Sequence, residues 1–218
     1  MTRSGQVLSL QSGRSRLFPA TREFPKSWTS AIIKSDLGST AKLGLCGLEG
    51  DEQADGLHHG GRDKAVLAYA ASHYEFWNAR YPAKHFAAGG FGENLTVSGW
   101  DEESCCVGDQ FEIGSCLFEV SQPRQPCWKL DRRWEIERLS QVVQLERRTG
   151  WYLRVLRTGT IKVGDAVILQ DRPHPSFTIA RALDILYANP RHPLDDQLLA
   201  ELPQLSEAWR TQLRTRCE

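Results

Sequence analysis

Short apolar runs separated by glycines and polar turns dominate residues 5–170 of the chain. Runs of this kind, rich in Val, Ile, Leu and Phe and bounded by turn residues, predict β-strands. The predicted strands span residues 30–34, 64–70, 94–99, 110–114, 116–122 and 165–170. A Gly-Asp pair precedes two of them, at 108–109 and 164–165, which indicates a repeated turn. Many short strands with frequent turns favour a sandwich or a barrel.

Helical spacing interrupts the strand pattern twice. Residues 72–82 start with Ser72 and Glu75 at the spacing of a capping box, and the proline at 82 must end the helix. A second helix is predicted over residues 131–151, with Gly150 as its C-cap. Its apolar face consists of Ile136, Leu139, Val142 and Val143.

After residue 171 the pattern becomes helical throughout. Three short helices separated by proline-containing turns are predicted within residues 177–190, 193–202 and 205–216. This segment is too small to bury a core of its own, so we expect it to pack on the preceding domain. The predicted organisation is a lead-in over residues 1–24, a β-rich domain over 25–170 and a three-helix segment over 171–218.

Composition and charge narrow the class of protein. The chain has 218 residues with 27 basic and 27 acidic side chains, so its formal net charge is zero. Neither a nucleic acid polymer nor an anionic membrane is indicated as a partner. The six cysteines form no CxxC pair, and no apolar run has the length of a signal peptide or a membrane span. We therefore expect a cytoplasmic protein with reduced thiols.

The segment 121–130, SQPRQPCWKL, contains the most distinctive cysteine. Two prolines make the segment rigid and non-helical, because proline fixes its own φ and extends the preceding residue. Arg124 and Lys129 flank Cys127, and nearby positive charge favours the thiolate, which is the nucleophilic and metal-binding form. The alternative interpretation is a small apolar side chain packed in a core.

Two glycine-rich stretches also point to binding. In residues 47–69, Gly60 and Gly61 allow backbone N–H groups to approach a ligand, and Lys64 follows at a strand entrance where it could meet a phosphate. The adjacent histidines 58 and 59 are poor joint ligands for one metal, and a solvated loop is the alternative. In residues 89–99, Asn94 could bond a heterocycle edge, or it could be an ordinary turn residue.

The order and spacing of these motifs resemble those of MOSC-domain proteins of the YiiM branch. The resemblance covers roughly residues 25–215 and is carried by residues 47–69, 91–99, 107–114, 120–130 and 150–165 together with the helical tail. The His-Gly-Gly motif is intact at residues 59–61, whereas Leu57 and His58 replace the expected apolar pair. The implied fold is mainly β with α: a MOSC-type β-barrel with peripheral helices and a small C-terminal three-helix segment.

The resemblance also implies a cofactor and a set of site residues. The cofactor is the molybdenum cofactor, a molybdopterin, and Cys127 corresponds to the metal ligand of the family. A soft thiolate suits a metal that is already held by dithiolene sulfurs. The implied catalytic residues are Cys127, His59 and Asn94. The implied cofactor-binding residues are Lys64, Arg124, Gly60, Gly61, Glu93 and Lys34.

The implied activity is reduction of small N-hydroxylated compounds, such as N-hydroxylated base analogues, to amines. Because the sequence has no flavin or iron–sulfur motif, the electrons would come from an external flavin or iron–sulfur protein. One alternative is sulfur transfer through a Cys127 persulfide, and another is a cofactor-binding module without turnover. Docking of the electron donor is one expected role of the helical tail, and packing or homodimer formation is another.

Overall fold

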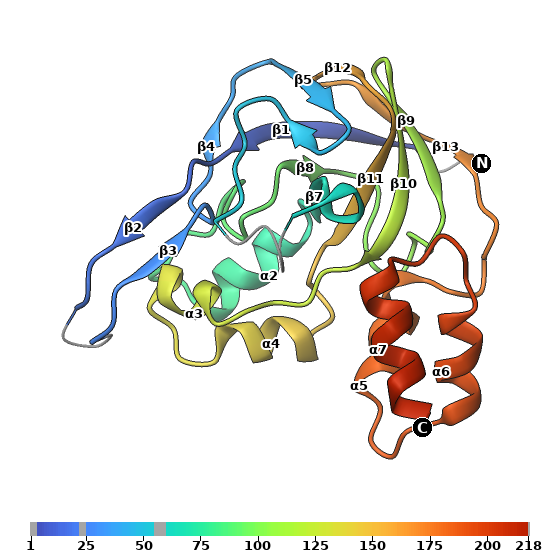
Figure 1. Ribbon diagram of the computed structural model, residues 1–218. Coiled ribbons are helices and arrows are strands. Elements are labelled where there is room, and N and C mark those ends of the chain that lie inside the picture. Colours follow the sequence, from blue (N-terminus) through green and yellow to red (C-terminus); the bar gives the residue numbers. More distant parts are fainter. Residues whose placement is uncertain (1–3, 22–24, 55–59, 218) are drawn as a thin grey trace.

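The computed structural model describes residues 4–21, 25–54 and 60–217, and within these a closed barrel of seven strands forms the centre of the molecule (Figure 1). Neighbouring strands are antiparallel except for one parallel pair, β7 with β8. Pairing of Gly5 with Val167 joins β1 to β13 and closes the barrel. In barrel order, the strands are β13 (Ala166–Asp171), β9 (Gln110–Ile113), β10 (Cys116–Pro123), β11 (Trp151–Arg157), β7 (Val66–Ala70), β8 (Leu95–Val97) and β1 (Gly5–Ser12).

The mainly-β barrel with peripheral helices predicted from the sequence is confirmed, but its N-terminal boundary was wrong. Residues 1–24 were predicted to be a lead-in, whereas β1 is a full barrel strand that pairs with both β13 and β8. The alternating burial of β1 follows from its sequence, because Val7 faces the core while Gln6 and Leu8 are exposed. Polar residues such as Gln6 and Ser9 interrupt the apolar sequence of β1, so a search for apolar runs misses this strand.

Shorter strands extend the barrel on one side. The predicted strand at residues 30–34 was also wrong, because β3 ends at Ser30 and β4 begins only at Ser35. β2 pairs with β3 to form a hairpin, which we call the arm, and the arm projects from the barrel (Figure 1). The short strands are β2 (Arg16–Phe18), β3 (Trp28–Ser30), β4 (Ser35–Asp36), β5 (Thr40–Gly44), β6 (Gly47–Leu48) and β12 (Gly159–Lys162).

Each of the two Gly-Asp pairs forms a turn before one of two neighbouring strands. Gly108 and Gly164 have φ values of 83° and 92°, which favour glycine. The carboxylate of Asp109 accepts the Cys106 N–H at 2.9 Å, and that of Asp165 accepts the Lys162 N–H at 2.7 Å. The repeated turn expected from the sequence is thereby confirmed at the starts of β9 and β13, which pair with each other.

Three helices cover one end of the barrel around a second, largely aromatic core. They are α2 (His73–Arg80), α3 (Lys129–Trp134) and α4 (Leu139–Leu145). Their shared core contains Tyr69, Trp77, Phe86, Phe91, Leu130, Leu139 and Val143. Helix α2 ends before Pro82 as predicted, but Ser72 makes no side-chain capping bond, so the capping box is not formed.

The single helix predicted over residues 131–151 was wrong. Glu135 and Arg138 adopt left-handed backbone conformations with φ of 53° and 59°, and they separate α3 from α4. Asp131 helps the new helix α4 to begin, because its carboxylate accepts the backbone N–H of Ser140 at 2.6 Å in the first turn of that helix. Gly150 is not a C-cap but lies immediately before β11.

The C-terminal helices share the main core with the barrel. They are α5 (Ile179–Tyr187), α6 (Pro193–Ala200) and α7 (Glu207–Cys217). Backbone bonds also join the two parts, from Ile179 N–H to the Cys105 carbonyl at 2.8 Å and from Ser206 N–H to the Ser121 carbonyl at 2.9 Å. The buried tail residues in this core include Ile179, Leu183, Leu199, Trp209 and Leu213. Among the described residues, no helix has the length and apolarity needed to cross a membrane.

Candidate functional site

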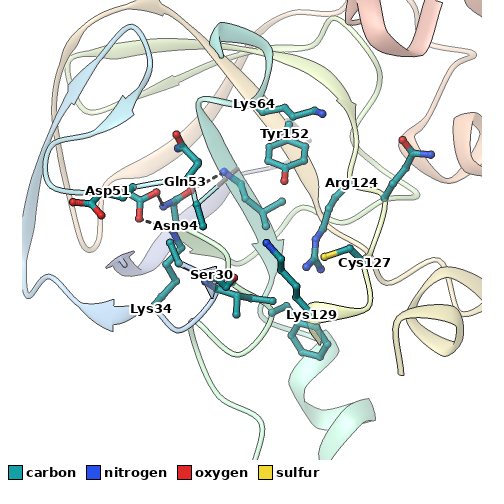
Figure 2. Close-up of a pocket in the computed structure, with 18 residues that line it drawn as sticks. Ser30, Lys34, Asp51, Gln53, Lys64, Asn94, Arg124, Cys127, Lys129 and Tyr152 are labelled. Atoms are coloured by element: carbon teal, nitrogen blue, oxygen red, sulfur yellow. Dashed lines mark hydrogen bonds and ion pairs between the residues drawn. The ribbon is translucent and has the colours of Figure 1, made fainter. Parts of the chain in front are cut away.

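A cleft opens beside the end of β10, where segments from distant parts of the chain meet (Figure 2). It is bordered by the residues after β3, the residues after β6, the 3-10 helix η1 (Arg62–Lys64), the loop before β8 and the segment that connects β10 to α3. The polar side chains that line it are Ser30, Lys34, Asp51, Glu52, Gln53, Lys64, Asn94, Arg124, Gln125, Cys127, Lys129 and Tyr152.

Cys127 is the cysteine that faces this cleft. It is half-buried, and in Figure 2 its sulfur points toward the Arg124 guanidinium. The rigid segment is fixed at both ends, because Arg124 N–H donates to the Gly150 carbonyl at 3.1 Å and the Cys127 carbonyl accepts the Leu130 N–H at 3.0 Å. The two prolines thus present the thiol at the end of a barrel strand.

Three other cysteines lie in a different environment. Cys105, Cys106 and Cys116 are buried. Burial raises the pKa of Cys105 and raises the pKa values of Cys106 and Cys116 to about 11. These thiols stay protonated near neutral pH, which makes them unreactive as nucleophiles or ligands. Accessibility and neighbouring charge therefore single out Cys127.

Arg124 is a buried cation with unused hydrogen-bonding capacity. The residue is only 5% exposed, and within the described residues its Nη1 has no hydrogen-bond partner. Tyr152, on the neighbouring β11, directs its hydroxyl into the same cleft (Figure 2). Burial raises the pKa of Tyr152 although Arg124 opposes the rise, so this hydroxyl retains its proton. A buried guanidinium nitrogen without a partner is expensive, and an anionic ligand would satisfy it.

The opposite side of the cleft contains a closed polar network centred on Asp51. The Asp51 carboxylate forms an ion pair with Lys34, accepts the Gly13 N–H at 2.7 Å and accepts the Asn94 Nδ2 at 2.9 Å. Burial lowers the pKa of Lys34, and the charge of Asp51 opposes this shift. The Asn94 amide is used at both ends, because its oxygen accepts the Leu67 N–H at 3.0 Å and its nitrogen also donates to the Gln11 carbonyl at 3.2 Å.

This network gives two of the predicted site residues a structural role. Lys34 and Asn94 do line the cleft, but their polar atoms already bind protein groups. Asn94 therefore does not present a vacant amide edge to a heterocycle, as the sequence interpretation expected. Its bonds instead connect β7 and β1 to Asp51, which fixes the wall of the cleft.

Glu93 was predicted to bind the cofactor, and the structure contradicts this prediction. Its side chain is completely buried and is not part of the cleft. The carboxylate accepts bonds from the Gly89 N–H at 2.6 Å, the Phe91 N–H at 2.9 Å and the Thr96 hydroxyl at 3.1 Å, and from the Tyr74 hydroxyl. Its role is to hold the glycine-rich loop before β8 in shape.

The His-Gly-Gly stretch is only partly described. His59 lies outside the described residues, so its predicted catalytic role stays a prediction. Gly61 has a φ of 91° and directly precedes η1, where Lys64 borders the cleft. Gly60 and Gly61 themselves are not among its lining residues. Asp63 anchors η1 through an ion pair with Arg154 on β11 at 2.7 Å.

Asp51 and Tyr152 line the cleft but were not recognised in the sequence, and Lys129 was noted only as a charge that flanks Cys127. Asp51 lies within the polar stretch 47–69, and Tyr152 alternates with the core residues Trp151 and Leu153 along β11. Lys129 directs its ammonium group toward the middle of the cleft (Figure 2). The nearest available signal was proximity to motifs already singled out, but only the pairing of β10 with β11 brings Tyr152 beside the cysteine segment.

Comparison with known proteins places this arrangement in a family. Residues 55–168 match the MOSC domain family, and residues 177–218 match the YiiM-like 3-alpha helix domain. The chain belongs to the MOSC domain family. The resemblance inferred from the sequence motifs is thereby confirmed, and Cys127 lies within the residues that match the MOSC domain.

Relatives agree with this assignment over nearly the whole length. The Escherichia coli protein YiiM is 35% identical over 197 residues, which cover 88% of this MOSC protein and 87% of YiiM. The crystal structure of YiiM from Geobacillus stearothermophilus matches with a TM-score of 0.83 at 31% identity, covering 98% of this chain and 100% of that one.

A longer fungal relative bears a functional name. A protein of Gibberella moniliformis called Reductase is 34% identical over 204 residues, which cover 92% of this chain. The match spans only 35% of the fungal protein, so the MOSC portion is one part of a longer polypeptide there.

Proposed function

We propose that this MOSC protein is a molybdenum-cofactor-dependent reductase that converts N-hydroxylated compounds, such as N-hydroxylated base analogues, to amines. The observation that carries the proposal is the pairing of an accessible thiol, Cys127, with the buried Arg124 guanidinium, whose Nη1 has no partner among the described residues. A relative named Reductase supports the reaction class. The family resemblance of the Cys127 motif supports the cofactor.

The residues of the cleft fit an anionic pterin cofactor. Among the described residues that line the cleft, Cys127 is the soft donor, which suits a metal whose other ligands are supplied by the sulfurs of its own cofactor. Arg124, Lys64 and Lys129 border the same space and could neutralise phosphate and other anionic parts. Lys34 would contribute mainly through position, because Asp51 already engages its ammonium group.

When bound, the cofactor would supply the two-electron chemistry that removes oxygen from the substrate nitrogen. The protein chain itself would bind the cofactor and orient the substrate. Cys127 Sγ would hold the metal, and Arg124 Nη1 would bind an anionic group beside it. The Tyr152 hydroxyl retains its proton and can donate a hydrogen bond to the oxygen of the N–O bond. Leu67 and Phe91 give the cleft an apolar border that limits water.

Sulfur transfer is the second candidate, since the same accessible cysteine beside a guanidinium could carry a persulfide. Purification under anaerobic conditions from a host that makes the cofactor, followed by metal and pterin analysis, separates the two. Stoichiometric molybdenum and pterin support the reductase. A persulfide on Cys127 without molybdenum supports sulfur transfer and would overturn the proposal.

Activity provides the direct test. The loaded protein should reduce N6-hydroxyadenine to adenine with reduced methyl viologen as donor. Cys127→Ser should abolish this activity while the fold persists, because a hydroxyl is a harder and far less acidic donor than a thiol. Cys46→Ser is the matched control, because Cys46 is exposed and lies outside the cleft, and it should retain full activity. Full activity in Cys127→Ser would refute Cys127 as the metal ligand.

A further inference from the structure

A surface of aromatic and cationic side chains adjoins Cys127 on the outside of the cleft. We call it the arm surface, and it comprises Arg16, Phe18, Trp28, Trp128 and Arg132. The arm is the hairpin in which Phe18 pairs with Trp28, and their rings are stacked with centroids 4.3 Å apart. Trp28 meets Trp128 edge-on at 5.9 Å. Trp128 follows Cys127 directly in the chain and is 49% exposed.

Cations sit on both ends of this aromatic row. The Arg16 guanidinium lies 5.0 Å from the centre of the Phe18 ring, and the Arg132 guanidinium lies 4.6 Å from that of Trp128. Arg132 also donates to the Lys26 carbonyl at 2.9 Å, which fastens the arm to α3. The arm surface is therefore preformed, so a partner would not have to order it on binding.

The composition of the arm surface is that of a docking site. Partly exposed aromatic rings and arginines lie together on the outside of the molecule, with Trp128 49% exposed. Aromatic residues and arginine are enriched at protein interfaces and among their energetically dominant residues. The structural role of the aromatic row, holding the arm to α3, does not require the exposed Arg16.

Charge indicates what kind of partner this surface fits. The chain is neutral as a whole, yet the described residues 14–21 and 25–30, which form the arm, contain three basic and no acidic side chains. In the adjoining α3, Arg132 adds a positive charge to the arm surface, and the carboxylate of the neighbouring Asp131 caps α4. Arg14, Arg16 and Lys26 are exposed and lie outside the cleft, so they exceed what an anionic cofactor would need. A surface this basic favours an acidic partner and repels a second copy of itself.

We infer that the arm surface is the docking site for an acidic electron-transfer protein, and this inference rests on the proposed reductase function. The partner, carrying a flavin or an iron–sulfur centre, would supply two electrons per turnover, from one molecule of a two-electron donor or from two molecules of a one-electron donor. With two protons from solvent, the N–O bond breaks and the products are the amine and water. Trp128 is covalently adjacent to Cys127, so a donor docked on Trp128 stands one residue from the proposed metal ligand.

This location differs from the one suggested by the sequence alone, which considered the helical tail for docking. The tail helices use their apolar faces in the core that they share with the barrel. In Figure 1 the arm and the tail lie on opposite sides of the barrel. The tail thus provides a matched control surface for charge changes.

The test uses a plant-type [2Fe–2S] ferredoxin, an acidic one-electron donor kept reduced by its NADPH-dependent reductase, and reduced methyl viologen as the artificial donor. The variant Arg16→Glu/Lys26→Glu reverses two exposed charges of the arm. Arg191→Glu/Arg214→Glu makes the same change on the tail, where both residues are exposed. Arg16→Glu alone is a second arm variant, at an exposed position of β2.

The arm variants should lower kcat/KM for ferredoxin about tenfold or more at low salt, because reversing interface charges slows electrostatically steered association. The difference should shrink at about 0.5 M NaCl, where charges are screened within a few ångströms. Turnover with methyl viologen should not change, and the tail variant should match the native protein with both donors. Calorimetric Kd values for ferredoxin should show the same order without any turnover.

Each contrary result has a distinct meaning. Native turnover with methyl viologen but none with ferredoxin, or equal ferredoxin kinetics in native and arm variants, would overturn the docking inference and leave the proposed function intact. A molybdenum-loaded protein that turns over with neither donor would instead contradict the proposed function. Self-association that the arm variants abolish, or tight binding of an RNA oligonucleotide in place of ferredoxin, would assign the arm surface to another partner and overturn the inference.

Discussion

The two sides of the cleft contain buried cations in opposite states. On one side the Lys34 ammonium has a carboxylate partner in Asp51, which is itself bonded to Gly13 and Asn94. On the other side Arg124 is equally buried, but its Nη1 has no partner in the described residues. Folding alone accounts for the first arrangement. The second leaves a cost that a ligand would remove, so the comparison separates the scaffold of the site from its binding side.

The largest expected effect comes from a substitution at Asp51, on the side of the cleft where the buried cation has a carboxylate partner. Asp51→Ala should lower the free energy of unfolding by about 3–5 kcal/mol, because it leaves the buried Lys34 cation uncompensated. Urea denaturation of the protein without cofactor measures this directly. Glu49→Ala is the control, because Glu49 is an exposed acid two residues away, and it should stay within about 0.5 kcal/mol of the native value. Equal stability of the two variants would show that the network is not the scaffold.

On the Arg124 side of the cleft, a substitution should reduce cofactor retention without reducing the stability of the protein. Arg124→Met should weaken cofactor retention about tenfold to a hundredfold, the value of a charge-assisted hydrogen bond, measured as pterin content under limiting cofactor. The stability of the empty protein should stay the same or rise, because the variant removes a buried nitrogen without a partner.

A neighbouring arginine supplies the control for this variant. Arg133 bonds the Ile32 carbonyl, and burial lowers its pKa to about 10. Arg133→Met should therefore reduce stability while retention stays near the native level. A drop in stability from Arg124→Met that matches Asp51→Ala would contradict the distinction between the two sides.

The sequence predicted those parts of the site that are local in the chain. The prolines, Arg124 and Cys127 lie within five consecutive residues, so their frame could be read directly. Asp51 could not be recognised in this way, because its partners Gly13 and Asn94 are 38 and 43 residues distant. Glu93 was misassigned for the same reason, since only the folded loop reveals that backbone N–H groups occupy its carboxylate.

The same limit applies to the fold. The β-rich domain and the three tail helices follow from local periodicity, whereas the choice of a barrel over a sandwich came from the resemblance to MOSC-domain proteins. The break between α3 and α4 was not predicted, because it depends on two non-glycine residues with left-handed backbone conformations, Glu135 and Arg138. Propensity disfavours these conformations, and contacts such as the Asp131 cap on Ser140 offset their cost.

Asn94→Ala tests whether this residue belongs to the scaffold or to the ligand. We expect a loss of about 1–3 kcal/mol in unfolding free energy, because the buried Leu67 N–H and the Gln11 carbonyl lose their partners. Pterin content per folded molecule should change less than it does in Arg124→Met. A large loss of retention without loss of stability would restore the direct cofactor contact expected from the sequence.

Tyr152→Phe should have the smallest effect. It tests the Arg124 side of the cleft without altering any charge. The hydroxyl faces the cleft, and burial keeps it protonated, so its removal deletes one hydrogen-bond donor and little packing. Stability and pterin content should stay at native levels. With methyl viologen as donor, kcat for N6-hydroxyadenine should fall about twofold to tenfold, the value of about 0.5–1.5 kcal/mol for one hydrogen bond. Tyr81→Phe, at the end of α2 and outside the cleft, should leave kcat unchanged. If Tyr152→Phe instead retained full kcat but lost pterin, the hydroxyl would be a cofactor contact, and the substrate would lie elsewhere in the cleft.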